Sequence, residues 1–129
     1  MRQRRYLRFS LWLAALPALV ACGGPTGPSG QTGPFAVKVE KTELRLVNRG
    51  DRAVYMFVAE REVLALINWT ACADPERCPG LGRDASETIR FSSENRLAPG
   101  REAVVFWWYS KRTATGYQPD SLRSFVVRL

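Results

Sequence analysis

Apolar and polar residues alternate in short runs along most of the chain, and this alternation predicts β-strands with one buried face. Leu44 and Leu46 alternate with Glu43 and Arg45, for example. A period of two residues places successive side chains on opposite faces of a strand. With turn signals such as Pro99-Gly100 between the runs, the pattern predicts seven strands and no helix. They cover approximately residues 35–40, 43–48, 53–60, 63–70, 86–91, 102–110 and 122–129.

Seven short strands within residues 35–129 predict an all-β fold, a single antiparallel β-sandwich of the immunoglobulin-like class. The likeness extends to architecture alone. True immunoglobulin domains have a Cys…Trp…Cys spacing across the sandwich, whereas Cys72 and Cys78 are only six residues apart. A small closed barrel is the alternative arrangement of the same strands.

One predicted strand is apolar on both of its faces. Val105, Trp107 and Tyr109 share one face, and Val104, Phe106 and Trp108 share the other. A two-layer sandwich buries only one face of each sheet, so one aromatic set is a candidate binding surface for a glycan or a protein. The candidate residues are Trp107, Trp108 and Tyr109. The alternative, which we favour, is a central strand whose outer face is covered by the long loop or by neighbouring side chains.

The segment 71–85 is the longest connection between predicted strands, and it contains Cys72 and Cys78. The spacing of these two residues around Pro75 predicts a disulfide in an oxidising compartment. A zinc site is the rival interpretation, but zinc needs four ligands and the chain has no histidine. Charged residues at the loop tip, namely Asp74, Glu76 and Arg77, are candidates for contact with a ligand. A plain surface crossover explains the same segment equally well.

The first 22 residues have the pattern of an export signal. Four arginines precede an apolar run over residues 9–21, which is shorter than the roughly 20 residues that a transmembrane helix needs. The run ends in Leu19-Val20-Ala21-Cys22, and this stretch resembles the lipobox of bacterial lipoproteins. The resemblance implies cleavage before Cys22 and a lipid on its sulfur. It also implies retention at the outer membrane, where one exists, because Gly23 and not aspartate follows the cysteine.

The residues after Cys22 are rich in glycine and proline and lack apolar side chains. They predict a flexible tether with a span of at most about 40 Å. The chain therefore divides into a signal peptide, residues 1–21; a lipidated cysteine with its linker, residues 22–34; and a sandwich domain, residues 35–129.

Composition then limits the function. The formal charge of +7 falls to +3 over residues 22–129, which carry 15 basic and 12 acidic side chains in alternation. This mixed surface is not the footprint of a nucleic-acid-binding protein. The absence of histidine removes Ser-His-Asp triads and His-ligated metals, so we expect neither an enzyme nor a bound cofactor or metal.

The best hypothesis is a lipid-anchored protein of the bacterial cell envelope that binds a glycan or a protein without catalysis. Its partners are then the membrane, through the N-terminal lipid, and an envelope component. Two alternatives remain open. One is an inhibitor of a secreted hydrolase that acts through the stapled loop, and the other is a structural spacer without a ligand.

Overall fold

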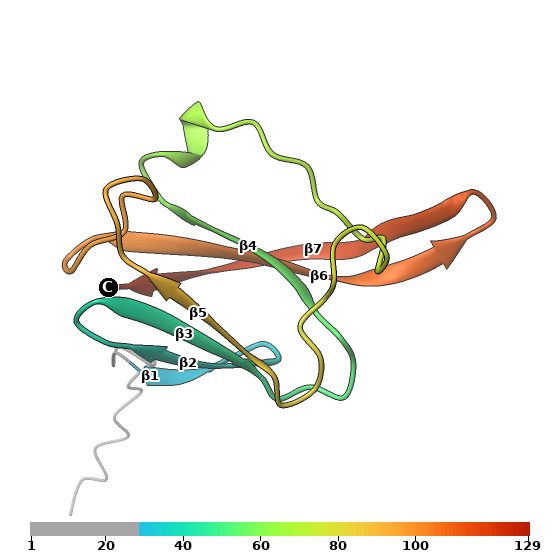
Figure 1. Cartoon of the computed structure of the whole chain (residues 1–129), viewed down its shortest axis with the longest axis horizontal. Coiled ribbons are helices and arrows are strands. Elements are labelled where there is room, and N and C mark those ends of the chain that lie inside the picture. Colours follow the sequence, from blue (N-terminus) through green and yellow to red (C-terminus); the bar gives the residue numbers. More distant parts are fainter. Residues whose placement is uncertain (1–28) are drawn as a thin grey trace, which may run out of the picture.

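The computed structural model describes residues 29–129, which form seven strands in two antiparallel sheets packed face to face (Figure 1). Four strands form one sheet, in the order β1-β2-β3-β5, and three form the other, in the order β4-β6-β7. Within the described residues no helix is long and apolar enough to cross a membrane. The strands are β1 Ser29–Thr32, β2 Phe35–Val39, β3 Glu43–Asn48, β4 Tyr55–Glu60, β5 Ser86–Arg90, β6 Glu102–Thr113 and β7 Gly116–Arg128, and a 3₁₀ turn, η1, covers Leu64–Leu66.

The order of the strands confirms the predicted immunoglobulin-like sandwich. In the constant-type immunoglobulin fold one sheet has the order A-B-E-D and the other C-F-G. Here β2-β3-β5 corresponds to A-B-E and β4-β6-β7 to C-F-G. No strand among the described residues corresponds to D, because residues 61–85 connect β4 to β5 without joining either sheet as a named strand. An additional strand, β1, lies beside β2 at the edge of the four-stranded sheet.

The predicted strand over residues 63–70 is wrong. Its first half, Val63 to Ile67, is a continuous apolar run that does not alternate, and it forms the η1 turn and unpaired backbone. Two of its apolar side chains are exposed, Leu66 by 76% and Ile67 by 36%. Composition alone suggested a strand here, but no neighbouring strand edge pairs with this segment.

The last strand begins earlier than residue 122, because β6 and β7 form a long hairpin that turns at residues 114–115. Its outer part projects beyond the sandwich, away from the end where β7 finishes (Figure 1). Neither face of this projection is buried in the domain, so its sequence shows no alternation. Strand β7 has one extra residue, Ser121, which has φ of 51°. This residue forms a β-bulge where the hairpin leaves the sandwich.

The sandwich also begins earlier than residue 35. Strand β1 lies inside the segment 22–34 that was predicted to be a flexible linker, and it pairs with β2 from Ser29↔Lys38 to Thr32↔Phe35. Gly33 makes the turn at φ of 58°, and a Cβ there would come within 2.8 Å of a ring carbon of Trp107. Glycine at this position therefore serves a tight turn against the core.

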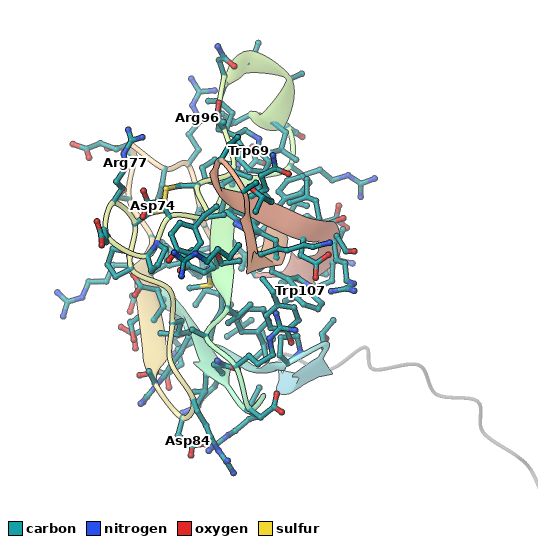
Figure 2. The ribbon with its side chains drawn as sticks, turned by 90° about the vertical axis from the view of Figure 1, so that its right-hand side faces the viewer. Trp69, Asp74, Arg77, Asp84, Arg96 and Trp107 are labelled. Carbon is teal, nitrogen blue, oxygen red and sulfur yellow. A yellow bond between two sulfur atoms is a disulfide. The ribbon has the colours of Figure 1, made fainter. Side chains whose placement is uncertain are left out.

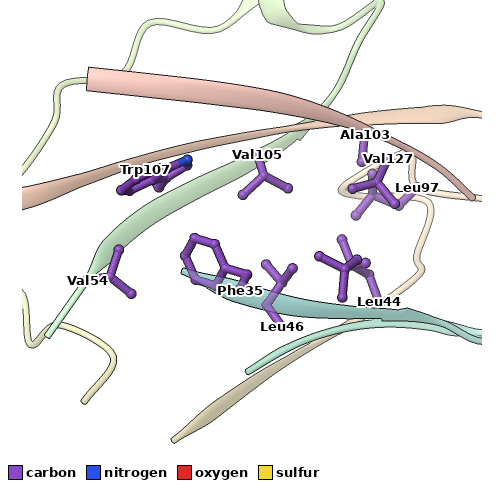
Figure 3. Close-up of a cluster of buried hydrophobic side chains, with 10 residues drawn as sticks. Phe35, Leu44, Leu46, Val54, Leu97, Ala103, Val105, Trp107 and Val127 are labelled. Carbon is purple, nitrogen blue, oxygen red and sulfur yellow. The ribbon is translucent and has the colours of Figure 1, made fainter. Parts of the chain in front are cut away.

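The core fills the space between the sheets with side chains of the predicted inward parity (Figure 3). Phe35, Leu44, Leu46, Val54 and Val105 are fully buried. The edge of the Phe35 ring meets the Trp107 indole with 6.1 Å between centroids. The remaining core residues are Val37, Leu97, Ala103, Trp107 and Val127.

One polar side chain is fully buried and organises the chain around it. The amide of Asn48, at the end of β3, donates to the carbonyls of Arg52 and Leu81 at 2.7 and 2.8 Å. Its oxygen accepts from the Gly50 amide at 2.9 Å. Leu81 in turn exchanges two backbone hydrogen bonds with Val54. Asn48 thus fixes both the turn into β4 and the return of the long connection.

We expect Asn48→Ala to lower the free energy of unfolding by about 3 kcal/mol, because it leaves buried carbonyl and amide groups without partners. Urea denaturation followed by tryptophan fluorescence measures the loss. Asn68→Ala is the matched control, since Asn68 is exposed, and its effect should stay within about 0.5 kcal/mol. A loss below about 1 kcal/mol in Asn48→Ala would contradict this role.

Candidate functional site

The side chains of β6 alternate between its two faces as predicted, but neither of its tryptophans is exposed. Trp107 points into the core and is 8% exposed, whereas Trp108 points outward and is only 3% exposed. Tyr109 is half-buried on the core side, where its ring packs against Trp107 and lies under the guanidinium of Arg52 at 4.2 Å. Because both tryptophans are buried, the candidate aromatic binding surface does not form. The alternative of a covered outer face is correct.

The cover is the connection from β4, which we call the strap and define as residues 61–81. It arches over the outer face of β4 and β6 (Figure 1). Trp69 of the strap stacks on Phe57 with 4.5 Å between ring centroids and on Trp108 with 6.0 Å. A tilted contact at 5.0 Å joins Trp69 to Phe106. One strap side chain therefore covers the outward aromatic residues of two strands.

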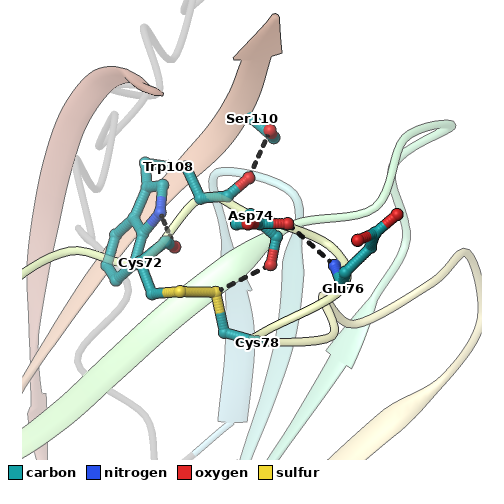
Figure 4. The surroundings of a disulfide bond; sticks show 7 residues. Cys72, Asp74, Glu76, Cys78, Trp108 and Ser110 are labelled. Carbon is teal, nitrogen blue, oxygen red and sulfur yellow. Dashed lines mark hydrogen bonds between the residues drawn. A yellow bond between two sulfur atoms is a disulfide. The ribbon is translucent and has the colours of Figure 1, made fainter. Parts of the chain in front are cut away.

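The disulfide predicted between Cys72 and Cys78 is present and closes the end of the strap (Figure 4). Two side chains on β6 hold the strap beside it. The indole nitrogen of Trp108 donates to the Cys72 carbonyl at 2.8 Å, and the Ser110 hydroxyl donates to the Ala73 carbonyl at 2.5 Å. The strap is thus attached to the sheet by polar as well as aromatic contacts.

The charged residues of the strap tip have different environments. Asp74 is half-buried, and its carboxylate accepts from the Glu76 amide at 3.0 Å, so it stabilises the turn (Figure 4). The side chains of Glu76 and Arg77 are exposed, and Figure 2 shows Arg77 at the surface. Burial, with a smaller contribution from the Asp74 carboxylate, raises the pKa of the nearby Tyr55 phenol.

A second location, which the sequence analysis did not select, has stronger features of a binding site. A pocket of about 680 Å³ lies at the end of the sandwich where β4 finishes, and this volume is in the range of small-molecule sites. The β2–β3 turn lines it with Lys41 and Thr42. The segment between β5 and β6 lines it with Phe91, Ser92, Ser93, Arg96, Leu97, Ala98, Pro99 and Arg101, and the end of β4 adds Glu60 and Glu62.

Glu60 is the unusual residue of this pocket. It is 2% exposed, and its Oε2 is the one buried side-chain oxygen or nitrogen in the described part of the chain that has no hydrogen-bond partner. A buried carboxylate oxygen without a partner is unfavourable, and it calls for a physical explanation. The opposite oxygen, Oε1, lies 3.7 Å from a guanidinium nitrogen of Arg101, which is an ionic contact and not a hydrogen bond.

Arg101 is shared between two carboxylates. The nitrogen that approaches Glu60 also donates to Glu62 at 3.2 Å. One guanidinium therefore faces two carboxylates, and this cluster carries a net charge of −1. A second hollow, of about 530 Å³, lies against the same three residues and also contacts Arg128.

The rest of the pocket has the opposite character. Lys41 and Arg96 are exposed lining residues, and neither forms an ion pair within residues 29–129. Leu97 is buried and Phe91 half-buried, and they supply apolar lining. The pocket thus combines a buried negative group, an apolar wall and exposed cations.

The strand pattern contained a signal for Glu60. Val54, Met56 and Val58 have the inward parity of β4, and Glu60 continues that parity at the strand end. It also pairs in register with Ala103, a core residue. A charged residue at an inward position is uncommon, so the strand pattern alone distinguishes Glu60 from an ordinary surface charge.

We expect Trp69→Ala to lower the free energy of unfolding by about 2–3 kcal/mol, because it uncovers Phe57, Phe106 and Trp108 together. Leu66→Ala changes the same strap at a side chain that is 76% exposed, and its effect should stay within about 0.5 kcal/mol. Denaturation curves of the two variants give the comparison. Equal losses would show that the strap does not act as a cover through Trp69.

None of the protein-family models, curated protein sequences or solved structures compared with the chain matches it. Two features of the described residues bear on function: the closed aromatic face under the strap, and the open pocket lined by Glu60.

Proposed function

We propose that this protein is a lipid-anchored module of the bacterial cell envelope that binds a ligand without catalysis, and that the Glu60 pocket is its binding site. The observation that carries the proposal is Glu60, which lines a pocket of about 680 Å³ while its Oε2 is buried without a hydrogen-bond partner. A ligand that inserts a donor against this carboxylate would supply the missing partner. A residue selected for stability alone would be apolar at this inward position.

The anchor part of the proposal rests on Leu19-Val20-Ala21-Cys22, which lies outside the described residues. Two acyl chains attached through Cys22 would hold the protein firmly at a membrane, because each buried methylene contributes about 0.8 kcal/mol. Such an anchor suits a protein that acts on envelope components near the bilayer.

The proposal is non-catalytic because the pocket holds no arrangement that activates a nucleophile. Its carboxylates, Glu60 and Glu62, are both in contact with Arg101. The hydroxyls of Thr42, Ser92 and Ser93 line the pocket, and the chain supplies no histidine to act as their base. Electrostatic binding is what these groups can provide.

We expect wild-type protein to retain a small envelope component that Glu60→Gln does not retain. Fractionated envelope lipids, glycan fragments and peptides are passed over immobilised protein, and the bound material is identified by mass spectrometry. Glu76→Gln, at the exposed strap tip, is the matched control and should retain as the wild type does. Urea denaturation of Glu60→Gln without ligand checks that a loss of retention comes from the missing charge and not from an unfolded domain.

Equal retention by wild type and Glu60→Gln would remove the pocket from the proposal. Loss of retention in Glu76→Gln or Arg77→Ala instead would favour the strap tip, the surface that the inhibitor hypothesis uses. No retention by any form would favour the spacer.

We expect Cys22→Ser to release the protein from the membrane fraction, because the sulfur that carries the lipid is lost. Cell fractionation and the mass of the N-terminal peptide measure this. A variant without Cys72 and Cys78 should remain in the membrane fraction, although it is less stable by about 2 kcal/mol. Membrane attachment that survives Cys22→Ser would contradict the anchor.

A further inference from the structure

We infer that the Glu60 pocket binds the head group of a phosphatidylethanolamine-type lipid, a zwitterion with an ammonium group and a phosphate, presented by the bilayer to which the protein is anchored. This inference rests on the proposed function and names its ligand. Three independent observations support it: the order of charges in the pocket, the donor that Glu60 requires, and the position of the pocket relative to the chain's N-terminal side.

Charges of opposite sign lie at different depths in the pocket. Glu60 is 2% exposed, whereas Arg101 and Glu62, which form an ionic cluster with it, are exposed. Lys41 and Arg96 are exposed too. A simple anion would meet the carboxylate of Glu60 inside, and a simple cation would meet the two basic residues outside. A zwitterion that inserts its ammonium first satisfies both.

The Glu60 carboxylate lacks a hydrogen-bond donor, because no group donates to its Oε2 and Arg101 approaches its Oε1 only to 3.7 Å. A primary ammonium group has three N–H bonds and forms short, strong bonds to carboxylates. A trimethylammonium group, as in phosphatidylcholine, has the same charge but no N–H bond. The pocket should therefore distinguish these two common head groups.

The pocket lies at the end of the sandwich from which the anchor would extend. Ser29, the first described residue, pairs with Lys38, and β2 continues from there to the pocket residues Lys41 and Thr42. Seven peptide units separate Cys22 from Ser29, so the chain between them can span at most about 25 Å. The β6–β7 hairpin extends from the opposite end of the domain (Figure 1). A lipid on Cys22 therefore keeps the pocket end close to the bilayer.

The order of groups in the lipid matches the order in the pocket. In a phosphatidylethanolamine the phosphate is nearer to the bilayer and the ammonium extends outward from it. A pocket facing the bilayer receives the ammonium at its depth, at Glu60, and the phosphate at its exposed cations, Lys41 and Arg96. The apolar side chains of Phe91 and Leu97 can contact the methylene groups between them.

The test uses residues 22–129 with Cys22→Ser, so that the lipid anchor does not itself insert into vesicles. Co-sedimentation is measured with phosphatidylcholine vesicles alone and with vesicles that also contain either phosphatidylethanolamine or anionic phosphatidylglycerol. We expect binding to the vesicles with phosphatidylethanolamine and a loss of at least about tenfold in Glu60→Gln. Glu76→Gln should bind as the wild type does.

A second variant tests the inference even if Glu60→Gln does not fold. Lys41→Ala combined with Arg96→Ala changes exposed side chains only, so it should fold normally and still lose binding to phosphatidylethanolamine vesicles. Equal binding to vesicles with and without phosphatidylethanolamine would overturn the inference. Binding confined to phosphatidylglycerol would overturn it too, since that pattern reports general attraction of basic residues to anionic lipid.

Titration with soluble phosphoethanolamine separates the sources of the ligand. Binding of this compound without vesicle binding would overturn the membrane source but leave the zwitterion chemistry of the pocket. If neither probe binds while the envelope extract still yields a component that depends on Glu60, the lipid inference fails and the proposed function stands. If no component depends on Glu60, both fail.

Discussion

The three-stranded sheet is apolar on both faces, and this constraint shapes the rest of the domain. Its inner face packs on the four-stranded sheet, but Tyr55, Phe57, Phe106 and Trp108 point the other way. Exposing them would create an aromatic patch in water, which is unfavourable. The strap prevents this by placing Trp69 over the patch and by bonding to Trp108 and Ser110. The segment that would contain strand D in an immunoglobulin domain is used instead as a third layer.

This use of the strap explains where the other stabilising devices lie. Several apolar side chains of the strap, such as Leu66 and Ile67, are exposed and do not hold it to the sheet. The Cys72–Cys78 disulfide restricts the unfolded states of its C-terminal part, and the Val54–Leu81 bridge and the Asn48 side chain fix the point where that part returns to the sheets. The buried polar side chain at this return is accordingly satisfied. Asn48, fully buried, has three hydrogen bonds.

Sequence reasoning succeeded where a local pattern determines the outcome and failed where distant contacts do. Period two placed Trp107 and Trp108 on opposite faces of the strand, since a strand's alternation is intrinsic to its backbone. The same reasoning could not show that Trp69 covers Trp108, because that contact joins residues distant in the chain. It also missed β1, whose residues in the Ser29–Thr32 range lack apolar side chains, so that only the edge of β2 makes them a strand. The projecting part of the β6–β7 hairpin was missed because neither of its faces is buried.

The two buried polar side chains, Asn48 and Glu60, differ in a way that indicates which of them serves function. Asn48 and Glu60 both lie at the ends of strands with inward parity, and both are almost inaccessible. Asn48 has partners for its amide nitrogen and oxygen, and removing it should only harm the fold. Glu60 retains an oxygen without a partner beside a pocket, next to a guanidinium that Glu62 also engages. An apolar residue in its place would pack on Leu97 and Ala103 without this cost. A buried carboxylate without a partner at an open pocket is not explained by stability, and this pocket lies at the end of the sandwich where the N-terminal strand β1 begins.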